Sequence, residues 1–293
     1  MQPLTIFLVP YRDRQQDKKL FDTYFKKITQ NKYSKYNKAI LYYVNQSDNR
    51  PFNRGAIKNI GAHICNKLYK NYDITLVFHD IDNLLIFPEL YSFTTSKNII
   101  KHYYGSTNSL GGIFVIKLSD FLYLKGFCNN WGWGYEDNVL YNKALEHHLM
   151  IDRTEFIDMA NINIADKYIK RSDKYTTTRD LCLSDIQRFF NNTYDNCFDI
   201  KAIQYNIVNN QDNNQDNNQD MNQDTNHDMN QDTNQDTDNI YIINVTNFLT
   251  RYNPDKKFLR YDLIKNGRDV SKWLIQNKYI KANRENRFIL FNI

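Results

Sequence analysis

The chain has 293 residues, 41% of them hydrophobic, so it is long enough for one large domain with a sizeable core. Lys and Arg number 38 against 33 Asp and Glu, and the resulting charge of +5 is spread along the chain. This modest excess suits an anionic small molecule such as a nucleotide and does not demand a nucleic-acid polymer. No apolar run reaches the roughly 18 residues of a membrane span, and a strand is expected almost directly after Met1. We therefore expect a soluble, cytoplasmic protein without signal peptide or membrane anchor.

The four cysteines lack CxxC and metal-finger spacing; they are Cys65, Cys128, Cys182 and Cys197. We expect structural thiols in a reducing compartment, with a Cys182 to Cys197 bridge as the alternative.

The first predicted strand ends in a basic, aromatic turn. Leu4 to Pro10 (LTIFLVP) is a continuous apolar run ended by proline, which is typical of a central strand buried on both faces. Tyr11-Arg12-Asp13-Arg14 follows at once. Ligands of open α/β sheets bind beyond the carboxyl ends of the strands, so Arg12 and Arg14 are placed for a phosphate or a uracil ring. A solvated basic turn is the plainer interpretation.

A helix, a strand and a second helix come next. Apolar side chains at helical spacing predict a core-packing helix over Asp17 to Thr29, and Lys38 to Asn45 reads as a strand. Phe52-Asn53-Arg54 then precedes a helix. Arg54 is either a surface cation at the helix start or a binding residue. The apolar face of this helix consists of Ala56, Ile57, Ile60 and Ile64.

The third strand, Ile74 to Phe78, delivers His79-Asp80-Ile81-Asp82. Two carboxylates two residues apart at a strand end can grip a divalent cation, which in turn neutralises a diphosphate. Asp80 and Asp82 are therefore candidate metal ligands. His79 alternates away from them, and we expect it to pack or to form a supporting hydrogen bond.

The middle of the chain begins with an irregular segment. Residues 89–109 mix polar and aromatic residues without a period, and one interpretation is a mobile substrate loop. Gly111-Gly112 then precedes a buried strand, Ile113 to Ile116. A short helix is predicted over Ser119 to Leu124, with Ser119 as its N-cap.

A loop rich in glycine and tryptophan, Asn129 to Tyr135, delivers Glu136 and Asp137 to the start of a helix. Trp131 and Trp133 offer large flat faces. Indole beside carboxylate is how proteins hold sugars, because the ring covers the apolar face of a pyranose and the carboxylates accept hydrogen bonds from its hydroxyls. One carboxylate can also act as a base. The plainer interpretation makes Asp137 a helix N-cap and Trp133 a core aromatic.

Residues 209 to 239 are built on a four-residue period, NNQD and its variants, and have almost nothing to bury. We expect them to be disordered. The flanking segments, Ile200 to Val208 and Ile240 to Val245, look like partner strands, so the repeat reads as an expanded hairpin loop. In the tail, residues 269–280 read as an amphipathic helix and 287–292 as a last strand.

Five motifs in order resemble the β-1,4-galactosyltransferase family, which is glycosyltransferase family seven and includes the xylosylprotein galactosyltransferases. They are VPYRDR, NQSDNRPFNRGAIKNIG, FHDIDNLL, the Gly111-Gly112 pair and WGWGYED. The resemblance implies a GT-A type α/β fold with a mixed central sheet flanked by helices. Taken together with the repeat and its flanking strand patterns, the resemblance predicts a catalytic domain at residues 1–208 and 240–246, with 209–239 inserted in a hairpin. Residues 247–293, for which the family offers no match, are predicted to form a small α+β C-terminal extension.

The resemblance implies inverting transfer of a hexose, galactose or N-acetylgalactosamine, from a UDP-sugar to a hydroxyl of a glycan or glycoconjugate acceptor. Asp137 is then the catalytic base, assisted by Glu136, and the acceptor binds to Trp133 and Glu136. The implied nucleotide-sugar-binding residues are Pro10, Tyr11, Arg12, Arg14, Phe52, Arg54, Asp80, Gly111 and Gly112.

Mn(II) is the implied cofactor, held by Asp82 and Asp80. The family completes this site with a histidine downstream of the tryptophan motif, but this chain has no histidine between His148 and His227. Asp166 lies about as far downstream of the tryptophan motif as the family's histidine does. A carboxylate is a good Mn(II) ligand, so Asp166 is a candidate third ligand.

Two other interpretations remain open. A catalytically inactive sugar- or nucleotide-binding module is favoured by the missing histidine and by Asn138, which stands where the family often has a third acid. A nucleic-acid-associated protein is favoured only by the Lys and Arg content of the tail.

Overall fold

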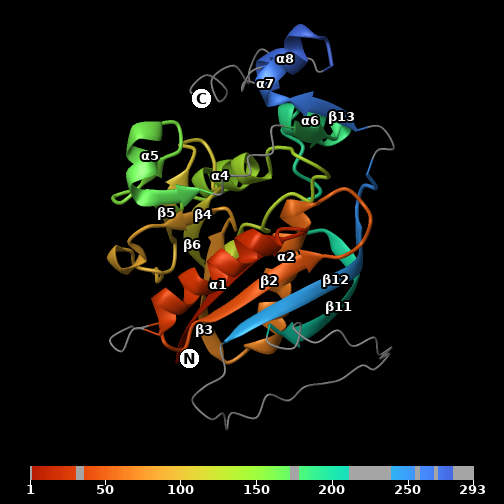
Figure 1. The fold of residues 1–293 in the computed structure, drawn as a ribbon. Helices are drawn as coiled ribbons and strands as arrows, with labels where there is room; N and C mark the ends of the chain where they lie inside the picture. The colour runs from red at the N-terminus through yellow and green to blue at the C-terminus, as the bar shows by residue number, and fades with distance from the viewer. Residues whose placement is uncertain are drawn as a thin grey trace.

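A mixed β-sheet with helices on both faces organises the chain (Figure 1). The computed structural model describes residues 2–30, 36–171, 178–210, 239–254, 258–266 and 270–279. Within these ranges nine strands form the large sheet. Their order across the sheet is β11 (Ile200–Asn209), β12 (Ile240–Thr250), β2 (Ile40–Gln46), β1 (Gln2–Tyr11), β3 (Tyr72–His79), β6 (Ile113–Lys117), β5 (Ile99–Gly105) and β7 (Met150–Asp152), with β8 (Ile157–Asp158) beside β5.

Strands β12, β2, β1 and β3 run parallel, and β6 lies antiparallel between β3 and β5. Two small sheets pair β4 (Asn83–Leu85) with β9 (Ile169–Arg171) and β10 (Thr178–Leu181) with β13 (Leu259–Asp262). The helices are α1 (Gln15–Thr29), α2 (Arg54–Leu68), η1 (Pro88–Leu90), α3 (Leu118–Tyr123), α4 (Glu136–Glu146), α5 (Ile162–Tyr168), α6 (Leu183–Phe190), α7 (Leu263–Asn266) and α8 (Val270–Gln276).

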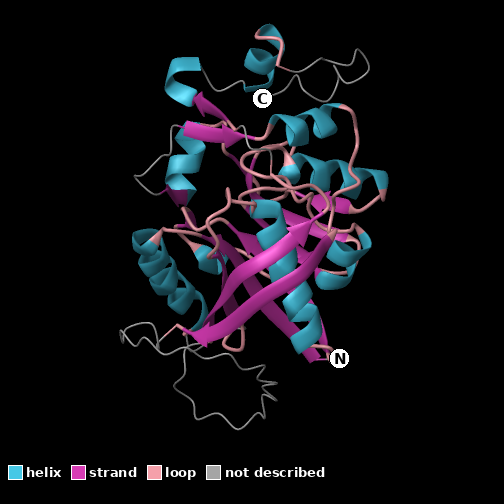
Figure 2. Cartoon of the chain, turned by 90° about the vertical axis from the view of Figure 1, so that its right-hand side faces the viewer, coloured by secondary structure: helices cyan, strands magenta, loops and turns pink. Residues whose placement is uncertain are grey.

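The central strand β1 is buried on both faces, as its continuous apolar sequence predicts. Residues 6–9 are fully buried. Ile6 and Leu8 pack into the core that contains the apolar face of α2, whereas Phe7 and Val9 pack into the core that contains α1. Successive side chains of a strand point to opposite faces, so β1 anchors one helix on each side. Figure 2 shows helices on both sides of the strands.

Two expectations from the middle of the chain are wrong. Helix α3 begins at Leu118, and Lys117 takes its cap position without a side-chain bond, so Ser119 is not the N-cap. The segment 89–109 contains β5, although its sequence looked irregular. His102 and most of its neighbours in β5 are buried, and a strand buried on both faces loses the polar alternation that marks a strand in sequence.

A disulfide joins Cys128 to Cys197, just before β11. The expectation of free thiols is wrong for this pair, and so is the alternative bridge between Cys182 and Cys197. Cys65 and Cys182 are buried and lie outside this bridge, and the Sγ of Cys182 lies 3.3 Å from the hydroxyl oxygen of Ser184. The bridge spans 69 residues of sequence, so only the fold decides which cysteines meet.

The segments around the repeat pair as antiparallel strands β11 and β12, as predicted. At the end of the hairpin the backbone N–H of Asn210 donates to the carbonyl of Ile240 at 3.1 Å. Strand β12 continues to Thr250, past the predicted end at Val245. Most of the repeat and the predicted last strand, 287–292, lie outside the described residues. The proposed division into domains stays a prediction.

Among the residues that the structure describes, none of the helices has both the length and the apolar character that a bilayer crossing requires.

Among the residues that the structure describes, His79 and His102 are the buried histidines. His79 bonds through Nδ1 to the carbonyl of Asp80 at 2.9 Å and through Nε2 to the hydroxyl of Tyr24 at 3.2 Å, which confirms the predicted packing role. His102 accepts a hydrogen bond at Nδ1 from Arg153 at 3.2 Å. Burial lowers the pKa of both imidazoles to about 4.

We expect a variant without residues 211–238, in which one glycine joins Asn210 to Asn239, to fold and to melt at the same or a slightly higher temperature. The hairpin ends already meet at the Asn210 to Ile240 bond. Shortening the loop from about 30 to about 3 residues lowers the entropy cost of closure by roughly 2 kcal/mol. Thermal melting by circular dichroism measures the change, and a clearly lower melting temperature would show that the repeat contributes to stability.

We expect the free energy of unfolding to fall as the pH drops from about 6.5 toward 4. In this window the unfolded chain protonates His79 and His102 while the folded chain keeps them neutral. The unfolded state therefore binds more protons, and stability rises with pH by about 1.4 kcal/mol per unit for each histidine. Urea unfolding at several pH values measures the slope. His102→Gln should reduce it and the exposed His147→Gln should not; equal slopes in all three proteins contradict this expectation.

Candidate active site

The guanidinium group of Arg54 lies at the centre of the candidate site. Arg54 is the first residue of α2, whose N-cap Asn53 closes the first turn. Its Nη2 donates to both carboxylate oxygens of Asp80, at 2.6 and 2.8 Å. Its Nη1 donates to Glu136 at 2.8 Å and also to Asp137. One side chain thus joins the end of β3 to the start of α4.

These ion pairs fix the charge states of the site. Burial alone would lower the pKa of Arg54, but the three carboxylates around it raise that pKa well above its ordinary value. Burial alone would raise the pKa of Asp80, yet its cationic neighbours, Arg54 first, bring it below the ordinary value. At Asp82, burial and the charge of Asp80 raise the pKa against the pull of Arg14. Arg54 and Asp80 therefore form a charged pair at neutral pH.

Asp137 is not a helix cap. Helix α4 begins at Glu136, and the cap position belongs to Tyr135, which has a left-handed φ of 59° and makes no side-chain cap bond. The Asp137 carboxylate instead pairs with Arg54 and accepts a hydrogen bond from Lys58 Nζ, 3.1 Å from Oδ1. The interpretation of Asp137 as a cap is therefore wrong, and its side chain is turned into the site.

Lys58 is a site residue that the sequence analysis missed. It lies one turn after Arg54 on α2, its side chain is 1% exposed, and Nζ lies 4.5 Å from the ring centroid of Phe127. A buried ammonium group needs a counter-charge, which Asp137 supplies. The sequence did contain a signal for Lys58. Arg54 and Lys58 are four residues apart, so they lie on the same face of the helix, next to its apolar residues.

The glycine pair allows the start of β6 to approach the site closely. A Cβ at Gly111 would lie 2.6 Å from Oδ2 of Asp137. Gly112 has a φ of +70°, and a Cβ there would collide with the carbonyl of Tyr104. Gly111 is therefore required by the close approach of Asp137, and Gly112 by its positive φ and the nearby Tyr104 carbonyl. Contact of either glycine with a donor sugar stays a proposal.

The two tryptophans of the WGWG loop have different environments. Trp131 is 1% exposed and stacks on Phe248 with ring centroids 5.5 Å apart. Trp133 is 38% exposed and packs edge-on against Tyr135. Of the two, Trp133 leaves an aromatic surface available to a sugar.

Arg12 organises the loop between β2 and α2. Its guanidinium donates to the backbone carbonyls of Gln46, Asp48 and Arg50 at 2.7 to 2.9 Å. It also lies 5.4 Å from the ring centroid of Phe52. Arg12 therefore shapes the loop that carries Phe52, and direct contact with a nucleotide stays a prediction.

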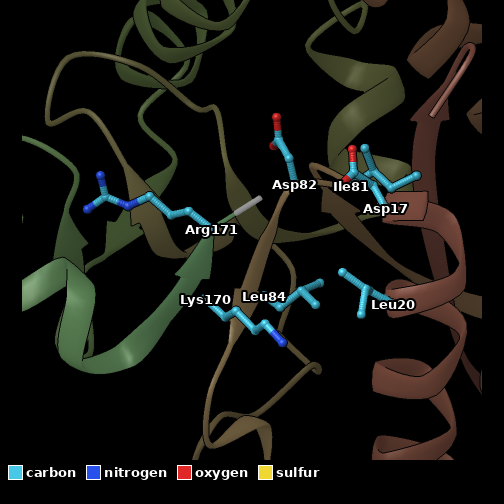
Figure 3. A pocket seen from close by; sticks show the side chains of 7 residues that line it. All are labelled: Asp17, Leu20, Ile81, Asp82, Leu84, Lys170 and Arg171. Atoms are coloured by element: carbon cyan, nitrogen blue, oxygen red, sulfur yellow. The ribbon is translucent and has the colours of Figure 1, made fainter. Parts of the chain in front are cut away.

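Arg14 points instead toward Asp82, one of the two candidate metal ligands. Its Nη1 lies 3.0 Å from Asp82 and 3.4 Å from Asp17. Pro10 is buried and Tyr11 is half-buried against Tyr43. Asp82 borders a small recess (Figure 3), from which the side chain of Arg171 extends away. The recess is lined by Asp17, Leu20, Ile81, Asp82, Leu84, Lys170 and Arg171.

The described residues do not complete a Mn(II) site. Asp80 and Asp82 each pair with an arginine, and Asp166, on α5, is 61% exposed and pairs with Arg171 at 3.1 Å. Strand β9 pairs with β4 so that Arg171 lies opposite Asn83, the residue that follows Asp82. The pairing therefore brings an arginine, and not Asp166, beside the two aspartates. In the part of the chain that the structure describes, no three His, Cys, Asp or Glu side chains are arranged to hold a metal. The expectation that Asp166 completes the site finds no support.

Arg179, in β10, is a second residue that the sequence analysis missed. Burial lowers the pKa of its guanidinium; Asp82 raises that pKa, and Arg14 and Arg54 lower it. These three charged groups are therefore electrostatic neighbours of Arg179. The surrounding sequence, TTTRDLC, carries no motif, because the position of Arg179 depends on how β10 pairs with the tail.

Two family models match consecutive parts of the chain. The N-terminal region of glycosyl transferase group 7 matches residues 2–89, and the N-terminal domain of galactosyltransferase matches residues 93–167. Together they cover more than half of the sequence. The chain belongs to glycosyltransferase family 7. The five sequence motifs therefore predicted the family correctly.

Curated relatives agree at moderate identity. A xylosylprotein 4-beta-galactosyltransferase of Caenorhabditis elegans is 28% identical over 165 residues, which are 53% of this chain and 55% of the relative. Beta-1,4-galactosyltransferase 1 of Homo sapiens is 27% identical over 156 residues, which are 50% of this chain and 38% of the relative. The chain spans about half or less of the length of these relatives.

Solved structures confirm the predicted GT-A type fold. The catalytic domain of Drosophila beta1,4-galactosyltransferase 7 in complex with xylobiose matches with a TM-score of 0.56 and 19% identity, over 90% of this chain and 97% of that one. A mutant of the same enzyme in complex with manganese, UDP-Gal and xylobiose matches with a TM-score of 0.52 and 18% identity over the same shares.

We expect the buried Lys58 and its partially exposed partner Asp137 to be energetically coupled. A double-mutant cycle of Lys58→Met and Asp137→Asn, followed by urea unfolding, should give a coupling energy of about 1 to 2 kcal/mol, because each change strands the other charge. Lys143 is the matched control. It is a buried lysine whose Nζ donates to the carbonyls of Lys125 and Gly126. A cycle with Lys143→Met should show no coupling to Asp137, and equal coupling in the two cycles contradicts a specific pair.

Proposed function

We propose that this member of glycosyltransferase family 7 transfers a hexose from a UDP-sugar to an acceptor sugar hydroxyl, with inversion at the anomeric carbon. The sugar is galactose or N-acetylgalactosamine. Relatives named as galactosyltransferases, and a structural neighbour in complex with UDP-Gal and xylobiose, favour UDP-galactose as donor and a glycan as acceptor.

The observation that carries this proposal is the shared guanidinium of Arg54. It binds Asp80, at the carboxyl end of a parallel strand where donors bind in open α/β sheets, and also Glu136 and Asp137. The donor side and the acceptor side of the site therefore lie within the reach of one side chain. Trp133, in the loop that delivers the two acids, gives the acceptor sugar an aromatic surface.

In the proposed reaction Asp137 accepts the proton of the acceptor hydroxyl. The hydroxyl oxygen forms a bond to the anomeric carbon while the bond from that carbon to the phosphate oxygen breaks, and UDP leaves with the electron pair. Glu136 accepts hydrogen bonds from acceptor hydroxyls. A diphosphate entering the site competes with the carboxylates for Arg54, and this competition frees Asp137 to act as a base.

The nucleotide half of the site is proposed to use the turn after β1 and the start of α2. Tyr11 and Phe52 offer aromatic surface to the uracil ring, and Arg14 and Arg54 offer guanidinium donors to phosphates. Mn(II) was expected from the resemblance. Because the described carboxylates do not form a site that fits it, no step of this mechanism passes through a metal.

A non-catalytic role is the second candidate. Both carboxylate oxygens of Asp137 are already bound by cations, Oδ2 by Arg54 and Oδ1 by Lys58. Asn138 donates to the carbonyl of Asn108 at 2.8 Å, where a third acid would stand in the family pattern. Such a protein would bind UDP-sugars without releasing UDP. A screen of UDP release across UDP-sugars and simple acceptors separates the two candidates.

We expect Asp137→Asn to reduce kcat for UDP release with an acceptor by roughly 100-fold to 10,000-fold, the usual contribution of a general base. UDP affinity should change little, because the amide keeps the size of the side chain. Asp120→Asn is the matched control, since Asp120 is also an aspartate in the first turn of a helix, α3, and is buried. Turnover of Asp137→Asn close to that of the parent would remove Asp137 from the mechanism.

A further inference from the structure

The two oxygens of the Asp137 carboxylate have different cationic partners. Oδ2 pairs with Nη1 of Arg54, and Oδ1 accepts a hydrogen bond from Nζ of Lys58 at 3.1 Å. The guanidinium of Arg54 is shared with two further carboxylates, those of Asp80 and Glu136. Among the ion pairs formed by the residues that the structure describes, Lys58 takes part in this one alone. Asp137 therefore shares one of its cations and keeps the other to itself.

The ammonium group of Lys58 is enclosed by protein. Its side chain is 1% exposed, and Nζ lies over the ring of Phe127, 4.5 Å from the centroid. That ring packs against Phe78 and Phe121, with centroids 5.3 and 5.6 Å apart. A cation is attracted to the face of an aromatic ring, and the attraction is stronger where water is excluded. Lys58 is therefore held by an aromatic face and by a carboxylate, away from solvent.

The next residue on α2 fixes the ring that covers Lys58. Asn59 is fully buried, and its side-chain amide donates to the carbonyl of Phe127 at 2.8 Å. Its side-chain oxygen accepts from the N–H of Phe127 at 2.9 Å. The helix that carries Lys58 thus also fixes the backbone of Phe127. A charged group held in this way has a defined position, and the carboxylate of Asp137, on α4, is oriented by it.

Burial gives the two cations different access to a ligand. The side chains of Arg54 and Asp137 are 23% and 18% exposed, whereas that of Lys58 is 1% exposed. A ligand that enters from solvent therefore meets Arg54 and Asp137 but not Lys58. The planar fork of a guanidinium also matches phosphate oxygens. When a diphosphate takes Arg54, Oδ2 of Asp137 is released while Oδ1 keeps its ammonium partner.

We propose, on the basis of the function proposed above, that Lys58 is a positioning residue for the catalytic base. It holds Oδ1 of Asp137 throughout the reaction and leaves Oδ2 as the proton acceptor. The acceptor hydroxyl gives its proton to Oδ2 while its oxygen bonds to the anomeric carbon, and UDP leaves with the electron pair of the broken bond. Lys58 contacts neither the sugar nor the phosphates, so its contribution is the orientation of the carboxylate.

The test measures UDP release by the full chain with UDP-galactose and the acceptor that gives the fastest release in the screen described above. Lys58→Met removes the donor group and should lower kcat by roughly 10- to 100-fold, since a displacement of about 1 Å at a reacting group can cost about 100-fold. The KM for UDP-galactose should stay within about threefold, because the lost interaction acts on the chemical step. Lys58→Gln keeps an N–H donor for Oδ1 without the charge, and its kcat should exceed that of Lys58→Met by about 3- to 10-fold, the effect of one hydrogen bond.

Lys143→Met is the matched control, because Lys143 is also a buried lysine but donates to backbone carbonyls. It should leave kcat and KM unchanged. Thermal melting and UDP affinity report whether each variant is folded. The kcat of the parent in folded Lys58→Met overturns the proposal, and so does a kcat of Lys58→Gln as low as that of Lys58→Met. If Lys58→Met does not fold, Lys58→Gln decides: a lower kcat at unchanged KM supports the proposal, and the kcat of the parent overturns it.

A crystal structure of the parent soaked with UDP separates this proposal from the transferase function. Nζ of Lys58 within hydrogen-bond distance of Oδ1, with Arg54 moved from Oδ2 to the diphosphate, supports the proposed geometry. Loss of the Lys58 contact, or Arg54 still bound to Oδ2, overturns it. A parent that releases no UDP in the screen rejects the transferase function, and a parent that turns over as fast as both Lys58 variants rejects the positioning role alone.

Discussion

The ion-pair network of Arg54 is the interaction on which the rest of the site depends. One guanidinium is shared by Asp80, Glu136 and Asp137, which approach it from β3 and α4. Taking four charges out of water is costly, and the cost is offset only where each charge keeps a well-placed partner. This requirement fixes α2, β3 and α4 relative to one another more tightly than apolar packing alone, because ion pairs and hydrogen bonds are directional.

Several neutral contacts serve the same alignment. The N–H of Asn53 donates to the side chain of Gln46, and the side-chain amide of Asn53 donates to the carbonyl of Asn129, where the tryptophan loop begins. Arg12 holds the loop that leads into α2 by three backbone carbonyls. Asn53 and Arg12 belong to motifs that were predicted to bind the nucleotide. Their hydrogen bonds also position the start of α2, and with it Arg54, so these motif residues have a structural role in addition to any role in binding.

The sequence predicted those features whose cause is local. The apolar run of β1 and the WGWGYED motif carry their meaning in adjacent residues, so the fold class, the family and the position of the two acids followed from them. The Cys128 to Cys197 bridge, strand β5 and Arg179 depend on pairing between distant segments, and no local pattern marks them. Lys58 is an intermediate case. Its four-residue spacing from Arg54 could be seen in the sequence, but its pairing with Asp137 could not, because the two residues are far apart in the chain.

The place of the repeat in the sheet bears on how this protein can evolve. Strand β12 runs parallel to β2 and starts at the amino end of the parallel strands, whereas the candidate site lies at their carboxyl ends. The repeat is therefore attached at the edge of the sheet opposite the candidate site. Its unit of four residues is a whole number of codons, so slippage of the copying machinery adds or removes units without a frameshift. A change in repeat length therefore enters the fold between the paired ends of the hairpin and away from the site.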